Sequence, residues 1–114
     1  MKVIKKAFET VNREDAHGGS GGRRLYVGDN EVSGVQGMTY GYLPGGSMFS
    51  WHNHSDMNEI MLVLKGTGIV RDDDGEYPYK PGDLFIYPSD TFHEIINPED
   101  YEHEYVFIRV YKRS

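Results

Sequence analysis

The stretch GSMFSWHNHSDMNEIMLVLKG, residues 46–66, places two histidines one residue apart and a glutamate five residues after the second. Side chains alternate between the two faces of a β-strand, so His52 and His54 are expected to point the same way. The polar residues 55–58 can turn the chain and bring Glu59 back beside the imidazoles. Two imidazoles and a carboxylate form a ligand set for a divalent transition metal. The alternative is a pair of surface histidines near a solvated acid.

The rest of the chain has the pattern of a β-protein. Short runs rich in Val, Ile, Tyr and Phe alternate with 14 glycines and five prolines, which is typical of short strands joined by turns. Because no segment has a helical period, the pattern predicts an all-β sandwich or barrel. The expected strands cover residues 24–27, 37–43, 48–52, 59–64, 68–71, 76–79, 84–87, 92–96 and 104–111, with a further one at 3–7.

Two polar segments are predicted to be loops. Asp72-Asp73-Asp74-Gly75 lies between two expected strands and is interpreted as a hairpin turn, because it lacks the alternating ligands of a calcium loop. The glycine-rich segment HGGSGG, residues 17–22, is expected to be a mobile arm before the barrel. An anion cradled by its backbone amides is the alternative.

Composition limits the classes of protein that need to be considered. A length of 114 residues predicts one domain, with an N-terminal strand and glycine-rich arm at 1–23 and a barrel at 24–114. The absence of cysteine excludes disulfides and thiolate metal sites. A net charge of −6 argues against a nucleic-acid partner. We expect no membrane partner and a cytoplasmic location, because the sequence has no long apolar run.

A second motif lies downstream, at residues 82–97. The sequence GDLFIYPSDTFHEIIN reads G-D-x4-P-x4-H-x3-N, and residues 46–66 read G-x5-H-x-H-x4-E-x6-G. Together these patterns resemble the two signature motifs of the cupin superfamily, over about half of the chain. One position departs from the family, which usually has glycine where Asp90 stands. Aspartate tolerates left-handed backbone better than most residues, so we expect the turn to be kept.

The resemblance implies a small double-stranded β-helix, or jelly-roll barrel, that holds one divalent metal ion. The ligands carried over from the family motifs are His52, His54, Glu59 and His93. Three nitrogens and one oxygen suit Fe, Mn, Ni, Co, Cu or Zn and do not choose among them. Four protein ligands would leave two positions of an octahedral ion for a small-molecule ligand.

The function implied by such a site concerns a small metabolite. One carboxylate leaves a divalent site with a charge of about +1, which favours an anionic or oxygen-rich ligand such as a hydroxy acid, a keto acid or a sugar derivative. The resemblance implies a metalloenzyme, and the family includes dioxygenases, isomerases, decarboxylases and lyases. A non-catalytic ligand-binding or sensing module is the alternative, because a fold does not determine a reaction.

Other side chains are expected near the metal from strand alternation. Arg109 is the first candidate catalytic or substrate-binding residue, because its planar donors suit a carboxylate; the alternative is a surface arginine lying on aromatic neighbours. Tyr40 is the second candidate, with packing as its alternative. His17 and His103 are expected at the surface. The expected pocket residues are Met48, Ser50, Met61 and Phe107.

The strand at 59–64 is apolar on both faces. Its inner face is expected to line the barrel, so its outer face must be covered by the second sheet or by another subunit. Together with the family resemblance, this pattern predicts a homodimer.

Overall fold

The structure is a computed structural model that describes residues 2–15 and 21–112, apart from the side chain of Trp51. These residues form strands and one 3₁₀ turn, η1 (Phe8–Thr10), which confirms the all-β class. No helix in the described residues has the length and hydropathy needed to cross a membrane. The strands are β1 (Arg13–Glu14), β2 (Arg23–Val27), β3 (Val35–Leu43), β4 (Met48–His52), β5 (Met57–Lys65), β6 (Gly68–Asp72), β7 (Gly75–Tyr79), β8 (Leu84–Tyr87), β9 (His93–Ile96) and β10 (His103–Tyr111).

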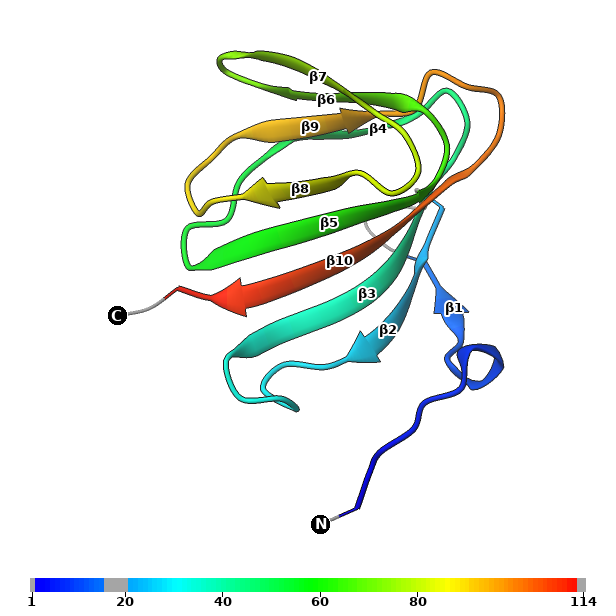
Figure 1. The fold of residues 1–114 in the computed structure, drawn as a ribbon, viewed down its shortest axis with the longest axis vertical. Helices are drawn as coiled ribbons and strands as arrows, with labels where there is room; N and C mark the ends of the chain where they lie inside the picture. Colours follow the sequence, from blue (N-terminus) through cyan, green and yellow to red (C-terminus); the bar gives the residue numbers. More distant parts are fainter. Residues whose placement is uncertain (1, 16–20, 113–114) are drawn as a thin grey trace.

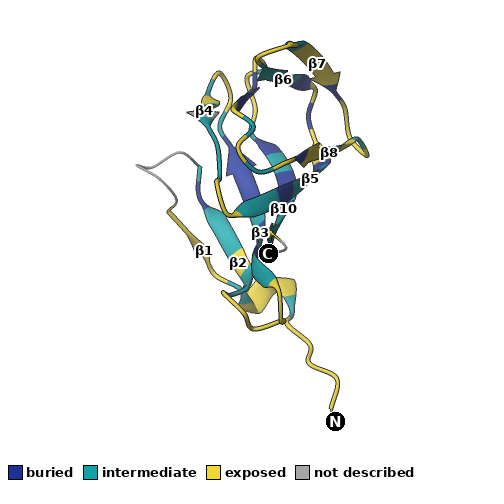
Figure 2. Ribbon diagram, turned by 90° about the vertical axis from the view of Figure 1, so that its left-hand side faces the viewer, coloured by how far each residue is buried: buried dark blue, intermediate teal, exposed yellow. Residues whose placement is uncertain are grey.

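The strands form two sheets that face each other as a jelly-roll barrel (Figure 1). One sheet has the order β1-β2-β3-β10-β5-β8 and the other the order β4-β9-β6-β7. The apolar core lies between them, and Figure 2 shows the buried segments on the central strands of the larger sheet. The core residues are Leu43, Met61, Val63, Val70, Tyr79, Tyr87, Ile95, Tyr105 and Phe107.

The loops agree only in part with expectation. The hairpin between β6 and β7 is confirmed, and Asp72 Oδ1 accepts the backbone N–H groups of Asp74 at 2.9 Å and Gly75 at 3.0 Å. The expected strand at 3–7 is wrong, because these residues have no strand partner, and Val3 and Ile4 are 97% and 78% exposed. Most of the predicted glycine-rich arm, including His17, lies outside the described residues.

His103 was expected at the surface, and that expectation is wrong. Its side chain is completely buried at the start of β10. The Nδ1 atom lies 2.6 Å from the Tyr79 hydroxyl, and Nε2 lies 2.8 Å from the Glu99 carboxylate. Gly66 makes room for the ring, because a Cβ at this position would lie 2.1 Å from His103 Cδ2. The histidine therefore has a packed, hydrogen-bonded position that the local sequence does not reveal.

Candidate metal centre

A β-bulge in β4 decides which side chains reach the barrel interior. Phe49 pairs with Ile95 and His52 pairs with His93. The interval from Phe49 to His52 on β4 is therefore one residue longer than the paired interval from His93 to Ile95 on β9. The extra residue puts both Phe49 and His52 on the inner face. Phe49 packs against the core.

The same bulge corrects two predicted pocket residues. Met48 is 46% exposed and Ser50 is also exposed, and neither lines the cavity. Uninterrupted alternation from His52 would have turned both inward. Because the bulge shifts the alternation by one residue, Phe49 takes the inner position instead.

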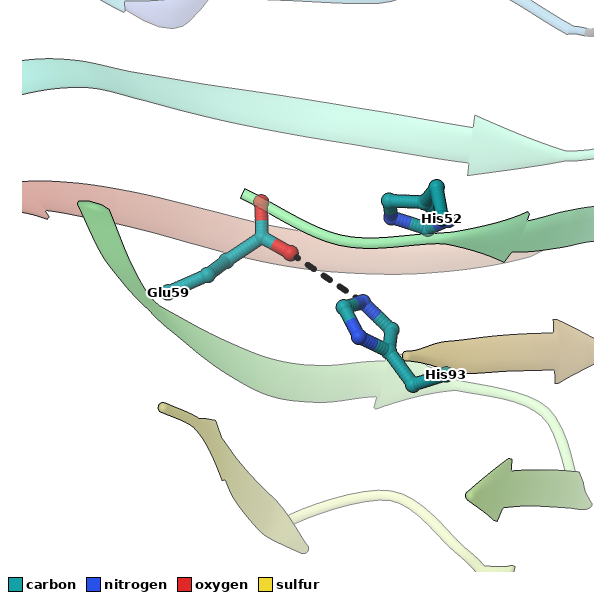
Figure 3. Close-up of side chains that lie close together, drawn as sticks. All are labelled: His52, Glu59 and His93. Carbon is teal, nitrogen blue, oxygen red and sulfur yellow. Dashed lines mark ion pairs between the residues drawn. The ribbon is translucent and has the colours of Figure 1, made fainter. Parts of the chain in front are cut away.

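Three of the four predicted ligands come together from three strands (Figure 3). His52 ends β4, Glu59 lies in β5 and His93 begins β9. One ligand atom from each lies within 4.8 Å of the other two. The Nε2 atom of His93 is 3.7 Å from Glu59 Oε1, which is too long for a hydrogen bond.

Backbone carbonyls orient both imidazoles. The Nδ1 atom of His52 lies 2.7 Å from the Ser50 carbonyl, and that of His93 lies 3.0 Å from the Thr91 carbonyl. A carbonyl only accepts, so each Nδ1 carries the hydrogen and each Nε2 of the neutral ring presents a lone pair. The Nε2 atom of His93 is buried without a hydrogen-bond partner.

Electrostatics keep the group in the protonation states that a metal requires. Burial raises the pKa of Glu59, but His93, His54 and Arg109 together outweigh burial and hold it below its ordinary value. Burial lowers the pKa of the His52 imidazole. Near neutral pH the group therefore offers an anionic carboxylate and a neutral imidazole, the forms that bind metals. The donor set and the partnerless Nε2 of His93 both fit a divalent transition metal.

His54 lies beside this group rather than within it. Its ring centroid is 5.5 Å from that of His52, and its side chain lines the cavity next to Glu59. The His54 carbonyl accepts the backbone N–H of Asp90 at 2.8 Å. Asp90 has a φ of +64°, the left-handed conformation expected where the family usually has glycine.

A cavity of about 320 Å³ opens beside Glu59 and His54, and His52 and His93 are not among its lining residues. Arg109 points into it from β10, and its Nη1 lies 3.6 Å from Glu59 Oε2. The Arg109 Nε donates to Gln36 Oε1 at 2.7 Å. The other lining residues are Gly22, Arg23, Thr39, Gly41, Phe49, His54, Met57 and Phe107.

The remaining predicted residues fall in different places. Phe107 lines the cavity as expected. Met61 faces inward but is completely buried in the core and does not line the cavity. Tyr40 lies on the outer face of β3, where its hydroxyl donates to Glu104 at 2.6 Å. Alternation turns its neighbour Thr39 inward, so the position of Tyr40 gives no support to a catalytic role at this site.

Glycines on the inner face of β3 shape the cavity, and the motif analysis missed them. A Cβ at Gly37 would lie 2.7 Å from the guanidinium of Arg109, and one at Gly41 would lie 2.7 Å from the Phe107 ring. Glycine in a strand interior often marks such a close approach. Their spacing of four residues, which places both on one face of a strand, was the signal in the sequence.

Comparison with known proteins agrees with the fold and the motifs. The model of the family described as Cupin domain matches residues 38–109. An uncharacterized protein of Methanocaldococcus jannaschii is 32% identical over 98 residues, covering 85% of this chain and 78% of that protein. An oxalate-binding protein of Thermotoga maritima is 32% identical over 66 residues, covering 58% and 54%.

Among solved structures, KdgF from Halomonas sp. superposes with a TM-score of 0.79 at 18% identity, covering 94% of each chain. Identity this low shows a shared fold. The family match, by contrast, spans more than half of the chain and includes His52, Glu59 and His93. The chain belongs to the cupin family.

Proposed function

We propose that this protein holds a divalent transition metal through His52, His54, Glu59 and His93 and acts as a metalloenzyme on a small anionic metabolite. The observation that carries the proposal is the buried Nε2 of His93. A buried polar atom without a partner destabilises a fold by about 1–3 kcal/mol. A metal ion would satisfy this atom, and Glu59 would balance part of the ion's charge.

The same geometry supports the choice of ligand atoms. Hydrogen bonds from Nδ1 to backbone carbonyls aim Nε2 of His52 and His93 toward Glu59. Such bonds are the usual way in which proteins orient metal-binding imidazoles. His54 is proposed as the fourth ligand because it lines the same cavity as Glu59 and its ring centroid lies 5.5 Å from that of His52. A rotation of its side chain would be needed to join the group.

The ion would supply Lewis acidity to a bound oxygen or lower the pKa of a bound water. The protein's own residues would bind and orient the ligand. Arg109 is only 15% exposed, it lines the cavity, and its Nη1 lies 3.6 Å from Glu59 Oε2. With a divalent ion in place, the charge around the ion and Arg109 would be positive, which favours a hydroxy acid, a keto acid or an acidic sugar derivative.

A non-catalytic role is the second candidate. One observation favours it: a relative that is 32% identical over 66 residues is named an oxalate-binding protein. Both candidates require the metal and the anion. The enzyme and the binding module differ in whether a bound acid is converted. Conversion is measured by incubating metal-loaded protein with candidate acids and recording the amount of each acid by NMR. Metal-dependent loss of one acid supports the enzyme, whereas tight binding with every acid recovered supports the binding module.

The outer face of the larger sheet supports the proposal of a homodimer. One row of apolar side chains runs across β8, β5, β10 and β3, and a second runs across β8, β5 and β10 and ends at Tyr40 on β3. Their β8 members, Ile86 and Leu84, are 65% and 54% exposed. A second copy would cover the same rows on both partners, as two-fold symmetry requires. The apolar members of the rows are Ile86, Ile60, Ile108, Met38, Leu84, Leu62 and Val106.

Metal content tests the proposal. Chelator-treated protein is loaded separately with Mn, Fe, Co, Ni, Cu and Zn, dialysed, and measured by elemental analysis. Wild type is expected to retain one ion per chain, and His52→Ala and His93→Ala to lose most of it. Glu94→Gln is the matched control, because this buried carboxylate pairs with Arg71 away from the site. Unchanged stoichiometry in both histidine variants would refute the assignment.

A further inference from the structure

The cavity extends from Glu59 and Arg109 along β3 to Arg23 of β2. On β3, Gly37 pairs with Arg109, and Gly41 pairs with Arg23 of β2. Gly37 and Gly41 lie four residues apart, which is about 13 Å along the strand. Both arginines line the cavity. The cavity therefore has a cationic group toward each end, one beside Glu59 and one at β2.

The wall between the two arginines is uncharged. On β3 it consists of Thr39 and Gly41, and neither extends far into the space. Phe107 and Phe49 contribute aromatic rings that lie 6.1 Å apart between their centroids. Because Gly41 lacks a side chain, the Phe107 ring can lie close against β3. These residues suit the hydrocarbon part of a ligand.

Arg23 is placed to accept an anion. Directly opposite residues of an antiparallel pair share a face, so Arg23 lies on the same inner face as Gly41. Its Nε lies 3.4 Å from Glu14 Oε1, and the two side chains are 37% and 53% exposed. Such an exposed ion pair contributes little to stability. A ligand carboxylate can therefore displace the Glu14 side chain from Arg23 with little loss of stability.

We propose that Arg23 forms a second anion subsite and that the cavity selects an elongated dianion, such as a dicarboxylate with several carbons between its ends. This inference rests on the proposed function, because one carboxylate would lie at the metal and Arg109. The other would be bound by Arg23, with the carbon chain along Thr39 and Phe107. Oxalate, whose carboxylates are directly joined, is too short to reach both ends.

Calorimetry with metal-loaded protein tests the subsite. Unbranched dicarboxylates from oxalate to adipate are titrated, together with the monocarboxylate that matches each in length. Wild type is expected to bind a diacid longer than oxalate most tightly. In Arg23→Gln, affinity for that diacid should fall about tenfold or more, the effect of losing one hydrogen bond to a charged group, while affinity for monocarboxylates is unchanged.

Two further variants sharpen the test. Glu14→Gln removes the competing carboxylate, so it is expected to strengthen binding of the long diacid severalfold. Arg24→Gln is the control for charge, because Arg24 lies on the outer face and donates to the Tyr42 hydroxyl at 2.8 Å. It should bind every diacid as wild type does, after native folding of each variant is checked by its melting transition.

The outcomes separate this inference from the proposed function. Diacid affinities that are equal in wild type and Arg23→Gln, or lowered equally by Arg23→Gln and Arg24→Gln, overturn the subsite. If metal is retained and monocarboxylates bind while diacid length has no effect, only the subsite fails. If wild type retains no metal, the proposed function fails and the inference fails with it.

Discussion

Replacing Glu59 by glutamine removes one charge from the centre of the site and leaves the size of the side chain almost unchanged. The Glu59 side chain is 6% exposed and lies 3.7 Å from His93 Nε2 and 3.6 Å from Arg109 Nη1. In the metal-free protein, the variant leaves Arg109 without its counter-charge. Gln36 still accepts from Arg109 Nε, so we expect a loss of about 1–3 kcal/mol in the free energy of unfolding.

Adding metal distinguishes the loss of the Arg109 counter-charge from the loss of a metal ligand. An ion present at a hundredfold excess over its dissociation constant stabilises the native state by about 2.7 kcal/mol. Wild type should gain this increment, whereas Glu59→Gln should lose most of it at the same free metal concentration. The assay is urea unfolding followed by fluorescence, with chelator and then with cobalt.

Glu94→Gln is the control for this experiment. Glu94 is also buried, but its carboxylate pairs with Arg71 at 3.1 Å on the other side of β9. This variant should lose stability in chelator and keep the full cobalt increment. Equal cobalt increments in wild type and Glu59→Gln would refute the role of Glu59 as a ligand.

Three further predictions concern packing, titration and assembly. Gly66→Ala should lower the free energy of unfolding by about 3 kcal/mol or more, because φ is +104° and the new Cβ would lie 2.1 Å from the His103 ring. Gly75→Ala is the control and should change the free energy of unfolding little, because there is open space around Gly75. Equal urea midpoints for the two variants would contradict the role of Gly66. Burial raises the pKa of Tyr79 to about 12, above its ordinary 10.0, so the unfolded state releases this proton first as pH rises. Stability should therefore fall between pH 10 and 12, by up to about 1.4 kcal/mol per pH unit from this group, and urea midpoints that stay level over this range would contradict it. Ile86→Glu should convert a dimer into a monomer in light scattering, whereas a wild-type mass near 13.0 kDa at every concentration would reject the dimer.

The approach of Glu59 to His52 could be predicted because alternation and a short turn act within a few residues. His93 was predicted only through the resemblance to the cupin motifs, since it reaches the site by the pairing of β9 with β4. Asp90 adopts the left-handed conformation that its place in the motif predicted. Most strand positions were predicted well because their signals are local: glycines and prolines lie in many of the turns that separate the strands.

The other site residues depend on features that no short stretch of sequence encodes. Alternation failed at Met48 and Ser50 because a bulge in β4 shifts the inner face to Phe49. His103 is buried because Gly66, far away in the sequence, leaves space for its ring. In both places the deciding contact lies between strands, so only the assembled barrel reveals it.

Anomalous diffraction from cobalt-loaded crystals would locate the metal and identify its ligands. If these three residues hold the metal, one strong peak is expected at about 2.0–2.2 Å from Nε2 of His52, Nε2 of His93 and a carboxylate oxygen of Glu59. The same map would show whether His54 turns to become the fourth ligand. If cobalt-containing crystals have their only peak away from Glu59 and His93, these residues do not form the metal site.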